Sequence, residues 1–244
     1  MAITATLSLL PRADGSATFK YGATTAIASV SGPMEVRPRD ELPDKTFIEI
    51  IVRPAVGVGG TFFRSPPPSP PTDTHPPPTG TRERALESLL LSALSPLIIR
   101  TYHPRTLLQI NLQIVEAADH TDATALLPVC INAATLALID AGMPMKSVLV
   151  ATTVFLDEAG EVAEEGKAGS RHVLGYTRAG ECVFVESLGS FDERGFGNAV
   201  QWGMGECAMG DDEGMDVDGK GATVGMVVRR AVERKVAGDM RWKE

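Results

Sequence analysis

The sequence predicts an α+β domain in which strands and helices pack in layers. The N-terminal part carries strand patterns, one later stretch alternates strictly between apolar and polar residues, and several stretches carry helical apolar spacing. Strands come first and then alternate with helices, about seven strands and four helices in all. This order differs from the regular repetition of a Rossmann or TIM-barrel fold.

Two strand regions make up the N-terminal part. Asp14-Gly15 predicts a turn, because glycine tolerates positive φ, and apolar stretches flank it. Ala23–Val30 is an apolar strand that Gly32-Pro33 closes. Lys45–Arg53 is rich in β-branched residues and predicts another strand, which ends at Pro54.

A proline-rich insertion is expected at residues 65–81. Residues 66–78 hold eight of the 17 prolines, which favours an extended, solvated segment because proline cannot donate ladder hydrogen bonds. One interpretation is a docking peptide for an SH3- or WW-type module. The preferred interpretation is a surface-loop insertion.

A helix and a strand follow the insertion. Apolar residues within 86–98 recur at helical spacing after Arg82, and Pro96 predicts the end of that helix or a kink in it. Leu108–Ile114 alternates apolar residues with glutamine and asparagine. This pattern predicts a strand with one face in the core and an amide-rich face elsewhere.

The rest of the chain alternates between the two types of element. Cys130–Ala141 is rich in Ala and Leu and predicts a closely packed helix that Gly142 stops. Three further strands are predicted: Ser147–Leu156, Arg171–Thr177 and Glu181–Ser187. Two further helices are predicted, Phe191–Met204 and a last one with a stripe of valines over 224–236. The other side of the last helix is basic, which can bind RNA or membranes, but a docked helix with a solvated charged face is the preferred interpretation.

The acidity of the chain is concentrated in one loop. The net charge is −8, and residues 206–218 hold six acidic residues and no Lys or Arg, so the rest of the chain carries −2. We therefore expect an acidic loop insertion at 206–221. Because the chain outside this loop is nearly neutral, we do not expect a stand-alone nucleic-acid binder of high affinity. A local strip of basic residues that binds RNA within an assembly is still compatible with this charge.

Composition and motifs exclude several classes of protein. No apolar run approaches the roughly 20 residues of a membrane helix, and the N-terminus lacks the features of a signal peptide. The three cysteines and four histidines are scattered, so we expect no metal site and a reducing compartment. No nucleotide-binding P-loop, zincin or α/β-hydrolase motif is present.

One acidic segment could carry chemistry. Asp157, Glu161 and Glu164 belong to a stretch of five carboxylates, which suits general acid–base work or Mg²⁺ binding. Glycines interrupt the stretch and it lacks apolar periodicity. A solvated turn is therefore the preferred interpretation.

Two groups of residues resemble the RNase PH family. The opening group is Arg12, Asp14-Gly15-Ser16-Ala17, Gly22, Thr24 and Gly32-Pro33-x-Glu35. The central group is Pro104-Arg105-Thr106, Ile131-Asn132-Ala133-Ala134 and Asp140-Ala141-Gly142-Met143-Pro144. Arg82 and Arg84 also resemble the basic residues ahead of the family's first long helix. The resemblance runs from about residue 4 to about residue 190.

The resemblance implies a fold and an assembly. The fold is an RNase PH-like layered β-α-β domain, of the ribosomal protein S5 domain 2-like type, over residues 1–244. Six such domains form a ring around a pore for single-stranded RNA. Active members degrade RNA from the 3′ end with inorganic phosphate, which needs a cationic phosphate site and a carboxylic acid or a Mg²⁺ ligand.

Both halves of that machinery are altered in this sequence. Asp122 stands where the family places a phosphate-binding arginine. A carboxylate about 4 Å from phosphate repels it by ~4 kcal/mol at an effective dielectric near 20. Arg171 stands where the family has its catalytic Asp, and no Asp or Glu occurs within 166–180. We therefore expect no catalytic residue, no metal and no cofactor.

Among the branches of the family, the sequence is most similar to a eukaryotic RNA exosome ring subunit of the bacterial RNase PH-like type. The resemblance implies a non-catalytic subunit that scaffolds the ring and lines its RNA channel. Its partners would be other RNase PH-like subunits, S1/KH-type cap subunits and single-stranded RNA, in nucleus, nucleolus and cytoplasm. The candidate RNA-binding residues are Arg64, Arg82, Arg84, Arg100 and Arg105.

An enzyme is the alternative. It would be an active phosphate- or metal-dependent exoribonuclease or nuclease that acts as a homodimer, with Asp157, Glu161 or Glu164 as the active carboxylates. A proline-motif adaptor is a third class, and it would require the 66–78 segment to bind a partner.

Overall fold

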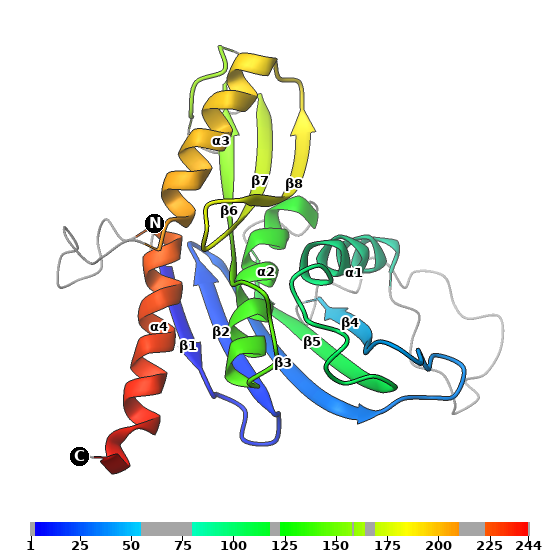
Figure 1. Ribbon diagram of the computed structural model, residues 1–244. Helices are drawn as coiled ribbons and strands as arrows, with labels where there is room; N and C mark the ends of the chain where they lie inside the picture. Colours follow the sequence, from blue (N-terminus) through cyan, green and yellow to red (C-terminus); the bar gives the residue numbers. More distant parts are fainter. Residues whose placement is uncertain are drawn as a thin grey trace.

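Helix α2 (Ala123–Asp140) lies between two β-sheets at the centre of the fold (Figure 1). This computed structural model describes residues 3–54, 80–117, 123–157, 159–163, 169–209 and 223–243. The two sheets with the helix between them confirm the predicted α+β class and its β-α-β layers.

The first sheet has five strands in the order β1-β2-β3-β5-β4. They are β1 (Ile3–Leu7), β2 (Gly15–Tyr21), β3 (Thr24–Glu35), β4 (Phe47–Arg53) and β5 (Thr106–Glu116). Strands β4 and β5 are parallel, and the other neighbours are antiparallel. Leu108, Ile110 and Leu112 of β5 are fully buried, whereas the amides between them lie on the opposite face, as the alternation predicts.

Two predictions for the N-terminal strands are corrected. Strand β3 continues through Gly32-Pro33 to Glu35, because a register shift against β5 between Ser31 and Met34 accommodates the proline. Gly15 is not a turn residue but the first residue of β2. A Cβ atom there would collide with the carbonyl oxygen of Ala137, so the glycine is needed for the close approach of β2 to α2.

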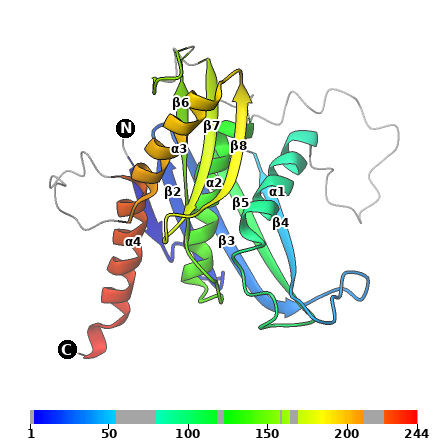
Figure 2. The same ribbon diagram turned by 45° about the horizontal axis from the view of Figure 1, so that its top comes forward.

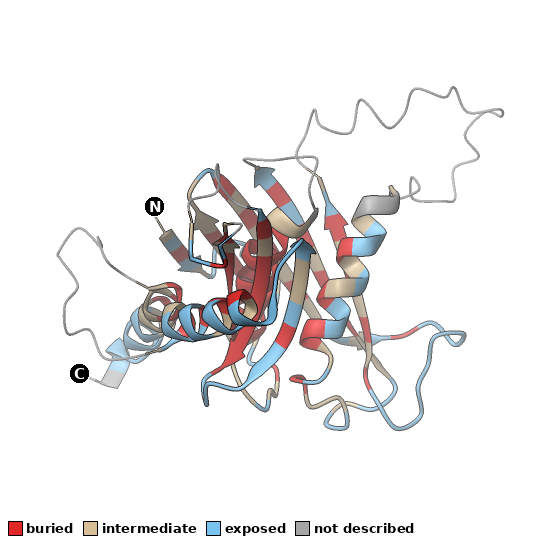
Figure 3. Cartoon of the chain, turned by 90° about the horizontal axis from the view of Figure 1, so that it is seen from above, coloured by how far each residue is buried: buried red, intermediate tan, exposed pale blue. Residues whose placement is uncertain are grey.

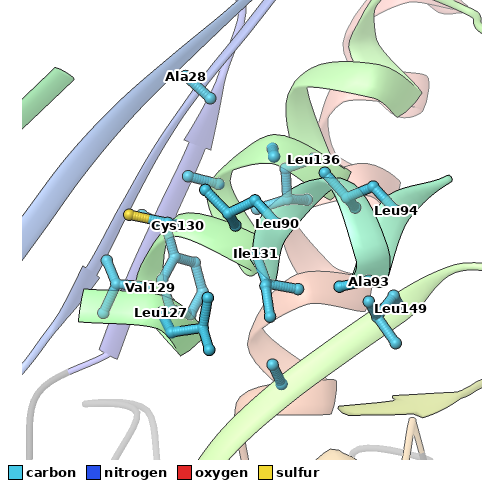
Figure 4. Close-up of a cluster of buried hydrophobic side chains, with 14 of the residues drawn as sticks. Ala28, Leu90, Ala93, Leu94, Leu127, Val129, Cys130, Ile131, Leu136 and Leu149 are labelled. Atoms are coloured by element: carbon cyan, nitrogen blue, oxygen red, sulfur yellow. The ribbon is translucent and has the colours of Figure 1, made fainter. Parts of the chain in front are cut away.

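Helix α1 (Thr81–Leu94) ends before Pro96, as predicted. It packs beside α2 and over β4, on the same side of the first sheet (Figures 1 and 2). Figure 4 shows its buried side chains Leu90, Ala93 and Leu94 close to Ile131 of α2. These residues carry the apolar face that the helical spacing predicted.

Helix α2 is longer than the sequence pattern indicates. It begins at Ala123 rather than at Cys130, and Pro128 lies inside it. Every residue from Leu126 to Leu138 is buried. Figure 3 shows that the buried segments gather in the middle of the molecule. Packing on all sides of the helix therefore outweighs the hydrogen bond that proline cannot donate. The Asn132 side chain bonds both the backbone N–H and the carbonyl of Ala151, 2.8 Å each, and so joins the helix to the second sheet.

The second sheet has the order β6-β7-β8. Its strands are β6 (Leu149–Leu156), β7 (Ser170–Thr177) and β8 (Cys182–Gly189), and they are all antiparallel. Helix α3 (Glu193–Cys207) packs on β6 and β7, and α4 (Val224–Asp239) packs on β1, α3 and β6 before a short 3₁₀ turn, η3 (Arg241–Lys243). The predicted strands and helices from residue 147 onward therefore correspond to β6, β7, β8, α3 and α4.

Parts of the two predicted insertions lie outside the described residues. These parts are 65–79 of the proline-rich insertion and 210–221 of the acidic one, whereas Gly80 precedes α1 and Glu206 belongs to α3. Among the described helices, none is long and apolar enough to cross a membrane.

Asp140, at the C-terminal end of α2, connects three elements. Its carboxylate accepts hydrogen bonds from the Ser8 hydroxyl at 2.7 Å and the Ser16 backbone N–H at 2.8 Å, and it pairs with Lys235 of α4. The Asp140 side chain is 4% exposed. Burial alone would raise the pKa of this carboxyl, but the bonds from Lys235, Ser8 and Ser16 and the lysine charge together lower it.

We expect Asp140→Asn to lower the free energy of unfolding by about 3 kcal/mol at neutral pH, because Lys235 then loses a nearly buried partner. The pKa of Asp140 is lower in the folded chain, so its contribution is present above the unfolded pKa, about 3.9, and is lost as the pH falls through the folded value. The difference between wild type and variant should therefore narrow below about pH 4. Urea unfolding followed by circular dichroism measures both effects.

Asp239→Asn is the matched control. Asp239 also pairs with Lys235, at 3.9 Å, but its side chain is 68% exposed. We expect this variant to change the stability by less than about 0.5 kcal/mol. Equal losses in the two variants would show that Asp140 does not connect the elements as described.

Candidate functional site

Arg171 of β7 lies beside the N-terminal end of α2. Its guanidinium carbon is 5.2 Å from the centre of the Phe155 ring, and its Nη1 donates a hydrogen bond to the Thr124 hydroxyl at 3.5 Å. Thr124 is in the first turn of α2. The start of a helix carries partial positive charge, so the arginine adds a full positive charge to a region that already favours anions.

The chemistry of this arrangement follows from the residue type. A guanidinium stays protonated and donates hydrogen bonds, so it can contact a phosphate. It cannot donate a proton to a leaving group or ligate a cation, which are the two roles of a catalytic carboxylate in the expected reaction. Arg171 therefore fits the binding of a phosphate group, but it cannot take the proton-donor or cation-ligand role of a carboxylate.

The other half of the expected phosphate site is not described. Asp122 and the residues 118–121 before it lie outside the described part of the chain. The repulsion of phosphate by Asp122 therefore stays a prediction. The contacts described at this end of α2 are those of Arg171 with Thr124 and Phe155.

The acidic segment after β6 forms a tight turn. The Asp157 side chain accepts hydrogen bonds from the backbone N–H groups of Ala159 at 3.0 Å and Glu161 at 2.9 Å. Glu161 is exposed, and Glu164 lies outside the described residues. Among the residues that the structure describes, no three His, Cys, Asp or Glu side chains are grouped to hold a metal ion.

His172 follows Arg171 but belongs to a different environment. Its two ring nitrogens bond the hydroxyls of Ser170 at 3.1 Å and Ser187 at 2.9 Å, and its ring makes edge contacts with Phe191 and Phe196. The residue is fully buried, and burial lowers the pKa of the imidazole. The sequence showed only an isolated histidine, and the structure gives it a packing role under α3.

Of the predicted RNA-binding arginines that the structure describes, Arg84 and Arg100 lie far apart. Arg84 is exposed in the first turn of α1, whereas Arg100 follows the other end of that helix. The 14 residues of α1 separate the two ends by roughly 21 Å. Arg82 is in the same turn as Arg84, its side chain is outside the description, and Arg64 lies outside the described residues altogether.

Arg100 and Arg105 differ in how far they are exposed to a possible RNA ligand. Arg100 is half-buried, and its Nε and Nη1 donate to the Thr46 carbonyl at 3.0 Å and the Ser95 hydroxyl at 3.4 Å. Arg105 is exposed and makes a long ion pair with Glu41, 3.5 Å between Nε and Oε1. Arg100 therefore stabilises the connection between α1 and β4, and Arg105 remains accessible. Sequence reasoning also missed the cation at Arg171, which it noted only as a lost carboxylate.

Comparisons with known proteins agree with this architecture. The sequence profile of the RNase PH family, described as the 3′ exoribonuclease family, domain 1, matches residues 2–144. The chain is 32% identical over 222 residues to the exosome complex component RRP46 of Saccharomyces cerevisiae, a match that covers 85% of this chain and 91% of the relative. It is 30% identical over 199 residues to rrp46 of Schizosaccharomyces pombe, covering 78% and 77%.

Solved structures give the same result. The crystal structure of Rrp46 from rice superimposes with a TM-score of 0.66 at 28% identity and covers 82% of this chain and 86% of the rice chain. An Archaeoglobus fulgidus exosome with RNA bound to the active site shares the fold, with a TM-score of 0.60 at 17% identity over 84% of each chain. From the opening and central motifs, the layered fold and the matched profile, the chain belongs to the RNase PH family.

Proposed function

We propose that this chain is a ring subunit of the RNA exosome and that it supports 3′-to-5′ RNA processing as a scaffold rather than as a nuclease. The match to the yeast exosome component RRP46 extends over 91% of that protein, so it is not limited to a shared motif. Its neighbours in the ring are other RNase PH-like subunits, S1/KH-type cap subunits bind beside it, and single-stranded RNA passes through the pore.

The main support for this proposal is that one edge of β8 has no neighbouring strand among the described residues. In the described part of the chain β8 pairs only with β7, so its other edge offers unpaired backbone groups. Val183, Val185 and Leu188 on this strand are 37%, 43% and 52% exposed, and Phe191 just beyond it is 49% exposed. An apolar strand edge of this kind promotes aggregation unless a partner covers it, which fits an obligate subunit.

The scaffold role is supported by Arg171. At the position where active relatives need a carboxylate, this chain presents a cation that can hold RNA phosphate but cannot protonate the leaving oxygen. We place the active assembly in nucleus, nucleolus and cytoplasm, and the catalytic work in other subunits.

RNA contacts are proposed for exposed arginines near the loops, from the set Arg64, Arg82, Arg84, Arg100 and Arg105. Arg84 and Arg105 suit this role best, because both are exposed. Arg100 suits it least, because its guanidinium already binds Thr46 and Ser95.

Replacement of both Val183 and Val185 by lysine should keep the chain out of the ring. Lysines on an edge strand oppose pairing with a second strand, and the exposed sites tolerate them in the isolated chain. Co-expression with the other ring subunits, followed by size-exclusion chromatography with light scattering, measures incorporation. Val162→Lys is the control, because Val162 is 42% exposed and lies away from β8, bridged to Leu156 at the other edge of the same sheet. Full incorporation of the double variant would contradict the role of this edge.

The purified chain should not shorten a 5′-labelled single-stranded RNA with phosphate, with Mg²⁺ or with both, because Arg171 stands where active relatives need a carboxylic acid, and a guanidinium does not protonate the leaving oxygen. Gel electrophoresis follows the RNA, and chromatography detects any nucleoside diphosphate released. Shortening that Asp157→Asn or Glu161→Gln abolishes would instead establish the alternative, a carboxylate-dependent nuclease. Light scattering would then test whether it acts as a homodimer.

Arg84→Glu and Arg105→Glu should each weaken the binding of RNA to the assembled ring and lower the slope of log affinity against log salt by about 1. Arg194→Glu, on an exposed arginine of α3, should leave both quantities unchanged. Filter binding at several salt concentrations measures them. If Arg84→Glu, Arg105→Glu and Arg194→Glu behave alike, the arginines do not contact RNA.

A further inference from the structure

A groove lies between α4, the C-terminal end of α2 and the β7–β8 turn, and we refer to it as the α4 groove. It consists of two adjoining cavities of about 550 and 420 Å³, which share Ile139, Val148 and Arg178 in their walls. Figure 1 shows α4 alongside β1, at the flank of the domain where α2 ends. Gly142 and Met143 of the central motif line the second cavity, whereas no residue of β8 lines either one.

The floor of the groove is apolar and is built on the core. Val228 is buried, and Ile139, Val148, Met209 and Val232 are half-buried. Three of these half-buried side chains, Val148, Met209 and Val232, pack directly against the hydrophobic core. The floor therefore exists before anything binds to it.

The walls of the groove are held in position by polar contacts. Lys235 of α4 pairs with Asp140 at the end of α2, which fixes the helix against the floor. Arg229 donates to the carboxylate of Glu233 at 2.7 Å and to the carbonyl of Met209 at 3.4 Å. A groove with fixed walls loses little conformational entropy when a ligand binds, so it can bind a short segment.

Two exposed cations lie on the rim of the groove. Arg229 and Glu233 neutralise each other. Arg178 and Lys146, on the walls, are exposed, and neither has an ion-pair partner among the residues that the structure describes. The rim therefore favours a partner with carboxylates, while the floor favours apolar side chains.

We propose that the α4 groove binds a short segment of a partner protein that combines apolar side chains with at least one Asp or Glu. Two adjoining cavities suit a chain that inserts successive side chains, with its carboxylates toward Arg178 and Lys146. A nucleic acid fits less well, because the floor offers it no polar partner. This site is separate from the ring contact of β8 and does not depend on it.

A random 12-residue peptide library displayed on phage, selected on the full-length chain, tests the proposal. The selected peptides should be enriched in Leu, Ile or Phe together with Asp or Glu. Their dissociation constants, measured by fluorescence anisotropy, should rise at least about tenfold for the double variant Arg178→Glu/Lys146→Glu. Arg37→Glu/Lys45→Glu, on exposed cations before β4, is the charge-matched control and should leave them unchanged.

A second pair of variants tests the floor. Val232→Asp should abolish peptide binding, whereas Val236→Asp, one turn further along α4 at a 48% exposed site, should not. Thermal unfolding of both variants checks that the chain is folded.

Three results would overturn the proposal. The first is that peptides bind equally well to wild type and to the charge-reversed double variant. The second is that decanoate, an apolar carboxylate, binds the groove while no peptide does, which would make it a small-molecule site. The third is that peptides bind only after deletion of residues 210–222, which would make the acidic loop of the same chain the occupant.

Discussion

The burial of α2 between the two sheets is the contact on which the rest of the molecule depends. From Leu126 to Leu138 this helix exposes almost no surface, and both sheets and α1 direct apolar side chains at it (Figures 3 and 4). Each fully buried leucine or isoleucine contributes about 1.5–3 kcal/mol relative to an exposed one. Gly15 allows β2 to pack closely against α2, because a side chain at this position would collide with Ala137 and Ala141.

The two ends of α2 have different roles. At the C-terminal end, Asp140 uses its carboxylate for the architecture, because it connects the β1–β2 loop, α2 and α4. At the N-terminal end, the neighbouring charge is the cation of Arg171. The stability of this framework therefore derives from the buried middle and the C-terminal end of the helix rather than from the charge at its N-terminal end.

The surfaces of the domain indicate a subunit rather than an independent protein. The open edge of β8 exposes valines and backbone hydrogen-bonding groups together, and the α4 groove combines an apolar floor with a positive rim. Both are formed by elements that the core holds in place. A scaffold needs such preformed surfaces, because binding then requires little reordering of the chain.

The sequence alone determined the class of fold, the type and order of most elements and the family. These follow from local periodicity and from short motifs, which do not require knowledge of distant contacts. It could not determine the start of α2 or the course of β3 past Gly32-Pro33, because tertiary packing overrode the proline signals there. The preference for a turn at Asp157–Glu161 was supported by local hydrogen bonds.

The tertiary structure alone decided how charged residues are used. Arg84, Arg100 and Arg105 look equivalent in the sequence, but Arg100 is bound to Thr46 and Ser95 while the other two are exposed. Arg171 and Thr124 are far apart in the chain, and only the packing of β7 beside α2 brings them together. Whether a charge stabilises the fold or meets a partner depends on distance and burial, and these arise from contacts between residues that are remote in sequence.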